Sequence, residues 1–142
     1  MKYLKLLLLV PIFMFSCGEA TPEEIEENKL HESLYAVHDE VMPEMSTINR
    51  ISRGLRKVKE STKLDSIQRD QFQSALTNLE KADEGMMDWM HNYKKPSKWR
   101  GEKTHEEIMD YLNVEMEKIS GVKQLMESSI KEGQTLLDAF EK

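Results

Sequence analysis

The chain has 142 residues, of which 39% are hydrophobic and 32% are charged, with 26 acidic against 20 basic side chains, as expected of one small acidic domain. This balance argues against a general nucleic-acid binder, which needs clustered positive charge. The single cysteine excludes an internal disulfide or a paired-cysteine metal site, and no later stretch is apolar for the 18 residues of a membrane span.

The first 17 residues have the layout of an export signal. Two lysines lie within residues 1–5, an apolar run covers 6–15, and the small residue Ser16 precedes Cys17. This ending resembles a bacterial lipobox, where a signal peptidase cuts before a cysteine that carries diacylglycerol. An ordinary signal peptide or an uncleaved anchor is the alternative. We predict a lipoprotein signal peptide over 1–16, a lipidated Cys17 with a short tether over 17–21, and a helical bundle domain over 22–142.

Lipidation of the only cysteine would attach the protein to a membrane. Multiple acyl chains hold a protein stably on a membrane. The residue after Cys17 is Gly18 and not Asp, which favours the outer membrane over the inner membrane by the enterobacterial sorting rule. Whether the domain faces the periplasm or the cell surface stays open.

A first long helix is predicted to begin at Thr21-Pro22-Glu23-Glu24, which combines a Thr N-cap, a proline in the first turn and a Glu three residues after the cap. Proline removes a backbone donor and clashes with the preceding turn, so Pro43 predicts a kink near residues 39–42, with the helix resuming toward residue 63. Steps of three and four place on one stripe Leu30, Leu34, Val37, Val41, Ile48, Ile51, Leu55 and Val58.

A second helix is predicted up to Pro96, and its apolar stripe contains one carboxylate, Asp83. Either Asp83 is paired, or the helix rotates to bury Ala82 instead, and we expect the rotation. The rest of the stripe is Phe72, Leu76, Leu79, Met86, Met90 and Tyr93.

A third helix starts with a second capping box at Thr104-His105-Glu106-Glu107 and continues to the C-terminus. The joints near 61–66 and 95–104 are short, so neighbouring helices must be antiparallel. The fold class is therefore predicted as all-α: an up-down-up three-helix bundle with long helices, the first kinked near Pro43.

This topology places most of the methionines at one level. Met42 comes level with roughly residue 85 and Met86 with roughly residue 113 if each helix turns back at its joint. His38 and His91 join this level, and Met126 lies outside it. The methionines at this level are Met42, Met45, Met86, Met87, Met90, Met109 and Met116.

Two interpretations of this level are open. Methionine fills irregular gaps in a core, and a bent helix creates such a gap. Alternatively, thioether and imidazole ligands outside the cytoplasm suit Cu(I), and His38 and Met42 share a helical face, as do Met87 and His91. The copper ligands would then be His38, Met42, Met45, Met86, Met87, Met90 and His91.

No common catalytic motif occurs: the sequence contains no GxSxG, HExxH, P-loop or GxGxxG. Asp88-x-x-His91 resembles half of a di-iron site, but no second copy exists. We therefore expect neither an enzyme nor a cofactor, with copper as the alternative.

Two basic stretches interrupt this acidic chain. The first, at residues 94–101, is predicted to lie beside the start of the first helix and its acidic run. There its cations either complement a helix dipole, or form a membrane-interface site from Lys95, Lys98, Trp99 and Arg100. The second has only Glu60 as a counter-charge, and is either a solvated surface or a site for an acidic partner; it contains Arg50, Arg53, Arg56, Lys57, Lys59 and Lys63.

Two methionine-containing blocks carry a family resemblance: HDEVMPxM at 38–45 and MMxWM at 86–90. On this lipoprotein frame they resemble a family of small lipoproteins from flavobacteria and relatives, some of them labelled "viral A-type inclusion protein". The resemblance covers most of the mature chain. It implies an exported helical lipoprotein of unknown function and transfers no catalytic or binding residue.

The sequence thus predicts a lipid-anchored, non-enzymatic binding or scaffolding module of the cell envelope. Its partners are the membrane, through Cys17, and an unidentified envelope protein. Coiled-coil-like association of the apolar stripes into a homo-oligomer is a further prediction. Soft-metal handling through the Met/His group is the alternative function.

Overall fold

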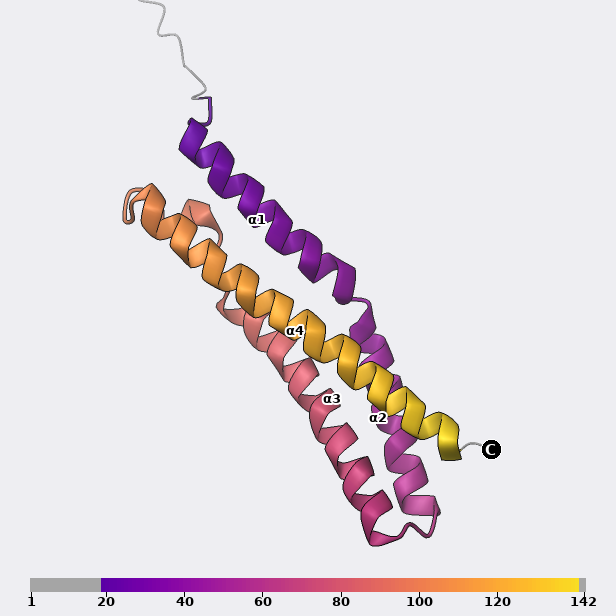
Figure 1. The fold of residues 1–142 in the computed structure, drawn as a ribbon. Helices are drawn as coiled ribbons and strands as arrows, with labels where there is room; N and C mark the ends of the chain where they lie inside the picture. The colour runs from indigo at the N-terminus through magenta and orange to yellow at the C-terminus, as the bar shows by residue number, and fades with distance from the viewer. Residues whose placement is uncertain (1–18, 141–142) are drawn as a thin grey trace, which may run out of the picture.

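The computed structural model describes residues 19–140. Its elements are α1 (Pro22–Val41), α2 (Glu44–Ser61), α3 (Ser66–Asn92), a one-turn helix η1 (Pro96–Lys98) and α4 (His105–Phe140) (Figure 1). Since α1 and α2 are the two halves of one bent helix, the predicted all-α three-helix architecture is confirmed. Within the described residues no strand forms, and no helix is long and apolar enough to cross a bilayer.

Side chains cap the N-terminal turns of α1 and α4 at the positions that the sequence predicts. The Thr21 hydroxyl accepts the Glu24 N–H at 3.1 Å, and the Glu24 carboxylate accepts the Thr21 N–H at 3.0 Å. Thr104 and Glu107 make the same exchange at the start of α4, at 3.3 and 2.8 Å. Each N-cap satisfies an otherwise unpaired donor and stabilises its helix by about 1 kcal/mol.

The first helix breaks at Met42–Pro43, at the edge of the predicted interval. The Met42 N–H closes the last turn of α1 on the carbonyl of His38 at 2.8 Å. Pro43 has no N–H to continue the ladder, and the next bonds run three residues back, from Met45 to the Met42 carbonyl and from Ser46 to the Pro43 carbonyl. α2 therefore starts in a new direction.

α4 is the central helix of the bundle. α1 and α2 lie along it one after the other, and α3 packs against both α2 and α4. α1 does not pack closely against α3, and in the view of Figure 1 the ribbon of α4 passes between them. The start of α1 and the α2–α3 loop lie at opposite ends of the bundle.

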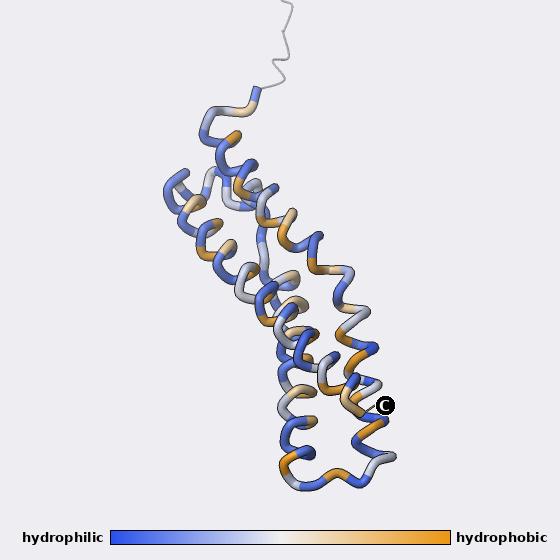
Figure 2. Tube along the Cα trace, turned by 45° about the vertical axis from the view of Figure 1, so that its right-hand side comes forward, coloured by the Kyte–Doolittle hydropathy of each residue, from blue (hydrophilic) through white to orange (hydrophobic). Residues whose placement is uncertain are grey.

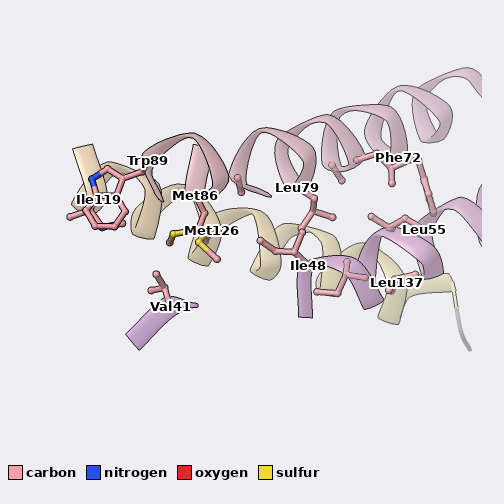
Figure 3. Packing of buried hydrophobic residues seen from close by; sticks show 14 of the residues in the cluster. Val41, Ile48, Leu55, Phe72, Leu79, Met86, Trp89, Ile119, Met126 and Leu137 are labelled. Atoms are coloured by element: carbon pink, nitrogen blue, oxygen red, sulfur yellow. The ribbon is translucent and has the colours of Figure 1, made fainter. Parts of the chain in front are cut away.

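Hydrophobic residues recur along each helix and form one continuous core (Figures 2 and 3). α3 is rotated as predicted: Ala82 is fully buried, while Asp83 is only half-buried. The largest fully buried side chains include Leu34, Ile51, Phe72, Leu79, Leu112 and Ile119.

The register between α3 and α4 differs from the prediction. A Cβ on Gly85 would lie 3.5 Å from Cγ2 of Val122, so this level of α3 meets residue 122 and not residue 113. The reason is the connection over residues 93–104, which does not turn back at once. It runs beside the first turns of α4, where the Lys94 N–H donates to the Tyr111 hydroxyl at 2.7 Å.

Candidate functional site

The structure divides the proposed copper ligands between the core and the surface. Met86 is fully buried, whereas its neighbour Met87 is 52% exposed, and His91, one turn further along, is also exposed. Met87 and His91 thus face solvent, on the side of α3 away from the core. The half-buried members that pack at the core edge are His38, Met42, Met45 and Met90.

The shifted α3–α4 register also changes the neighbours of Met86. Figure 3 shows the side chains of Met86 and Met126 pointing toward one another, and both are fully buried. The sequence placed Met126 outside the methionine level, which is wrong, because the prediction assumed an immediate turn before α4. No group of three or more His, Cys, Asp or Glu side chains that could hold a metal occurs within residues 19–140. The copper site stays a prediction.

Aromatic rings fill the space between α1 and α3. All five Tyr and Trp residues after Cys17 take part, together with two histidines. Neighbouring ring centroids lie 4.7–6.3 Å apart, within the range of favourable aromatic contacts. We call this set the aromatic cluster: His31, Tyr35 and His38 of α1, Trp89 of α3, Tyr93 and Trp99 of the connection between α3 and α4, and Tyr111 of α4.

Tyr93 is the centre of the aromatic cluster. Its hydroxyl lies 2.6 Å from Nδ1 of His31, and its ring stacks on Trp89 at 4.9 Å. Burial raises the pKa of Tyr93 and lowers the pKa of His31, so both groups are held in their neutral forms, and one hydrogen bond joins them. This bond joins α1 to the end of α3 without close approach of the two backbones.

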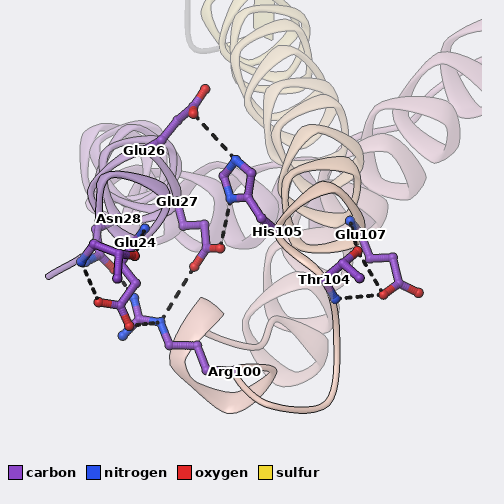
Figure 4. A network of polar contacts seen from close by, with 9 residues as sticks. Glu24, Glu26, Glu27, Asn28, Arg100, Thr104, His105 and Glu107 are labelled. Carbon is purple, nitrogen blue, oxygen red and sulfur yellow. Dashed lines mark hydrogen bonds and ion pairs between the residues drawn. The ribbon is translucent and has the colours of Figure 1, made fainter.

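A polar network closes the end of the bundle where α1 begins (Figure 4). The carboxylate of Glu27 is 4% exposed, and its Oε1 lies 3.0 Å from Nδ1 of His105. Its Oε2 lies 3.6 Å from Nε of Arg100, which is also 3.3 Å from Glu24. The hydrogen bond to Glu27 raises the pKa of His105, with further support from Glu23 and Glu26.

This network places the basic stretch of residues 94–101 beside the acidic start of α1, as predicted. Arg100 is held by Glu24 and Glu27 and donates to Asn28 at 3.2 Å. Trp99 is half-buried against Tyr111, with the ammonium groups of Lys94 and Lys103 5.0 and 5.2 Å from its ring centre. These contacts engage Trp99 and Arg100 within the protein, and the membrane-interface role of Lys95, Lys98, Trp99 and Arg100 stays a prediction.

A second buried carboxylate belongs to Glu115 on α4. Its side chain is 6% exposed and accepts a hydrogen bond from Nζ of Lys118 at 2.7 Å, which raises the pKa of Lys118. The pair borders a groove of about 420 Å³ between α3 and α4, with Trp89 also on its wall. Lys118 and Glu115 both line the groove, and the ammonium charge of Lys118 compensates the carboxylate.

Three histidines have polar partners among the described residues. His31 bonds to Tyr93, His38 lies 2.8 Å from Asp39, and His105 bonds to Glu27. The His31 and His105 contacts join separate elements of the bundle, whereas His38 and Asp39 are consecutive residues of α1.

The sequence contained a signal for the aromatic cluster that the apolar stripes did not use. His31, Tyr35 and His38 follow steps of four and three, and Trp89 and Tyr93 are four apart, so each set shares one helical face. The network around Glu27 was harder to find, because its residues come from three separate segments. Cys17, the predicted lipidation site, lies outside the described residues.

No protein-family model, curated protein or solved structure matches this chain. Likeness to a characterised protein therefore supplies no function. The resemblance to small flavobacterial lipoproteins stays a prediction.

Proposed function

We propose that this chain is a membrane-anchored, exported lipoprotein that acts as a non-enzymatic helical binding or scaffolding module of the cell envelope. The observation that carries this proposal is the short distance in sequence between Cys17 and α1. Only four residues separate Cys17 from Pro22, the first residue of α1. At about 3.5 Å per residue, the start of α1 stays within roughly 17 Å of a lipid on Cys17.

The length of the bundle supports a role in holding a binding surface away from the membrane. α1 and α2 have 20 and 18 residues and follow one another along α4, which has 36. At 1.5 Å per residue, the α2–α3 loop lies roughly 55 Å from the start of α1. A lipid at one end therefore leaves the far end free to meet other molecules.

The contacts of the titratable side chains support a non-enzymatic role. Four of the partly or fully buried titratable groups are Glu27, His31, Tyr93 and Glu115, and each is held by a neighbouring side chain. A general base must reach the proton it abstracts from a substrate. Glu27, His31 and Tyr93 instead join separate elements of the bundle, and Glu115 is paired within α4.

The anchor is tested by replacing Cys17 in the native host. In the C17S variant a radiolabelled fatty acid supplied to the cells should no longer be incorporated into the protein, since thioether attachment of diacylglycerol needs the sulfur. Glu19→Gln is the matched control and should keep the label. Equal labelling of C17S and E19Q would refute the lipid anchor.

A further inference from the structure

The far end of the bundle carries a charge opposite to that of the rest of the domain. Between residues 45 and 63 there are six basic side chains and one acidic one, Glu60. The remainder of the chain after Cys17 has 12 basic and 25 acidic side chains. We define the basic face of α2 as five residues of the helix, Arg50, Arg53, Arg56, Lys57 and Lys59, together with Lys63, which lies two residues past the end of the helix.

The basic face of α2 points to solvent. Ile48, Ile51 and Leu55 fix the opposite side of the helix in the core, where each is at most 2% exposed. Five members of the face are exposed, and only Lys59 is half-buried. The orientation of the face is therefore set by core packing.

The charges of this face are not neutralised within the described part of the chain. No ion pair among residues 19–140 includes a member of the face, whereas Arg100, Lys118 and Lys123 each pair with a carboxylate. The two side-chain hydrogen bonds of the face go to neutral amides, from Arg50 to Gln134 and from Lys59 to Gln73. The face keeps its full positive charge.

Two shallow hollows adjoin the face on its α3 side. One, of about 250 Å³, is lined by Lys59, Lys63 and Arg69 with Thr62 and Leu64, and has no carboxylate on its wall. The other, of about 400 Å³, is lined by Arg56, Lys59, Glu60, Gln73, Leu76 and Glu80. Lys59 borders both, so carboxylates of a partner that enter the first hollow would be within reach of the face.

From this geometry we propose that the basic face of α2 binds an acidic segment of another protein; this rests on the proposed role as a binding module. Arginine suits such a partner because its planar guanidinium pairs with carboxylates through two hydrogen bonds. From Arg50 to Lys59 the helical part of the face is roughly 14 Å long, about the length of an acidic helix of two to three turns.

Other polyanions fit less well. The nearest member of the face, Arg50, lies roughly 40 Å along the helices from Pro22, several times the screening length of about 8 Å, so the anchoring membrane does not attract it. A long nucleic acid would extend past the face onto a domain with 25 acidic against 12 basic side chains. A short acidic protein segment avoids this repulsion.

The test measures binding of a fluorescent 16-residue Glu/Ala peptide by the mature lipidated protein in neutral detergent, at about 0.15 M salt. The variant R50Q/R53Q/K57Q removes three charges of the face. The control K29Q/K81Q/K131Q removes three exposed charges elsewhere. We expect the face variant to lose about tenfold in affinity, or about 1.4 kcal/mol, and the control to stay within about twofold.

Three results would overturn the proposal: no peptide binding by the unaltered protein, equal loss in both variants, or tighter binding of single-stranded DNA than of the peptide. All substituted side chains are exposed, and unchanged thermal midpoints verify that both variants fold. The assay takes place in detergent. Failure of the anchor in the Cys17→Ser experiment is therefore distinguishable from failure of this surface.

Discussion

Oε1 of Glu27 on α1 lies 3.0 Å from Nδ1 of His105 at the start of α4. Glu27 is 3% exposed, and a carboxylate this buried must be paired because transfer out of water is costly. The pair joins the helix nearest the proposed anchor to the helix that contacts every other long helix of the bundle.

This pair predicts that the bundle is less stable in alkaline solution. The hydrogen bond to Glu27 raises the pKa of His105 on folding. Such a group stabilises the fold fully below its unfolded pKa of about 6.5, and the stabilisation is lost as pH rises through the folded pKa. The difference in thermal midpoint between the unaltered protein and His105→Gln should therefore be largest at acidic pH and shrink as pH rises.

His31 provides the control, because its pKa is shifted in the opposite direction. Burial lowers the pKa of His31, so protonation below about pH 6.5 favours the unfolded chain. The His31→Gln variant should gain stability relative to the unaltered protein on acidification. A His105→Gln effect that is constant across pH would show that the Glu27 pair does not titrate.

Two glycines of α4 predict opposite effects of the same substitution. A Cβ on Gly133 would lie 2.7 Å from Cγ2 of Ile51, a branched side chain with little rotamer freedom. Gly133→Ala should therefore destabilise the bundle by about 1–3 kcal/mol. Gly121 has no neighbour within 4 Å of such a Cβ, so Gly121→Ala should stabilise it by about 0.5–1 kcal/mol.

Urea unfolding of both glycine variants gives the free energies directly. Equal stability of Gly133→Ala and Gly121→Ala would show that α2 and α4 do not approach closely at Ile51 and Gly133.

Trp99 should act as a packing residue. Its ring meets Tyr111 at 6.1 Å, and Lys94 and Lys103 lie against it. Trp99→Ala should lower the free energy of unfolding by about 2 kcal/mol. In the unlipidated C17S background it should leave binding to anionic vesicles unchanged. Lost vesicle binding with unchanged stability would instead assign Trp99 to the membrane interface.

Copper binding should be weak. Met86 is fully buried beside Met126, while Met87 and His91 face solvent, so the predicted ligands do not converge on one point. Titration of the purified protein with Cu(I) under reducing conditions should give no binding tighter than micromolar. Tighter binding that is lost in Met42→Leu would restore the soft-metal function.

Local signals predicted the helices well. The capping boxes at Thr21 and Thr104 and the break at Pro43 depend on bonds within a few residues, which the sequence displays directly. The rotation that buries Ala82 follows from the cost of burying Asp83.

Contacts across the bundle were harder to predict. The position of Met126 depends on the path of residues 93–104, in which Trp99 packs against Tyr111 of α4. The bond between His31 and Tyr93 spans 62 residues, and helical spacing within one segment does not reveal it. The candidate site was therefore only partly predictable: its residue types were visible, and their arrangement was not.

The central claim, a helical module held by a lipid on Cys17, is tested most directly by the intact mass of the protein purified from membranes of its native host. The account predicts a chain that begins at Cys17, lacks residues 1–16 and carries the mass of diacylglycerol on that cysteine. A chain that retains residues 1–16, or an unmodified Cys17, would contradict it.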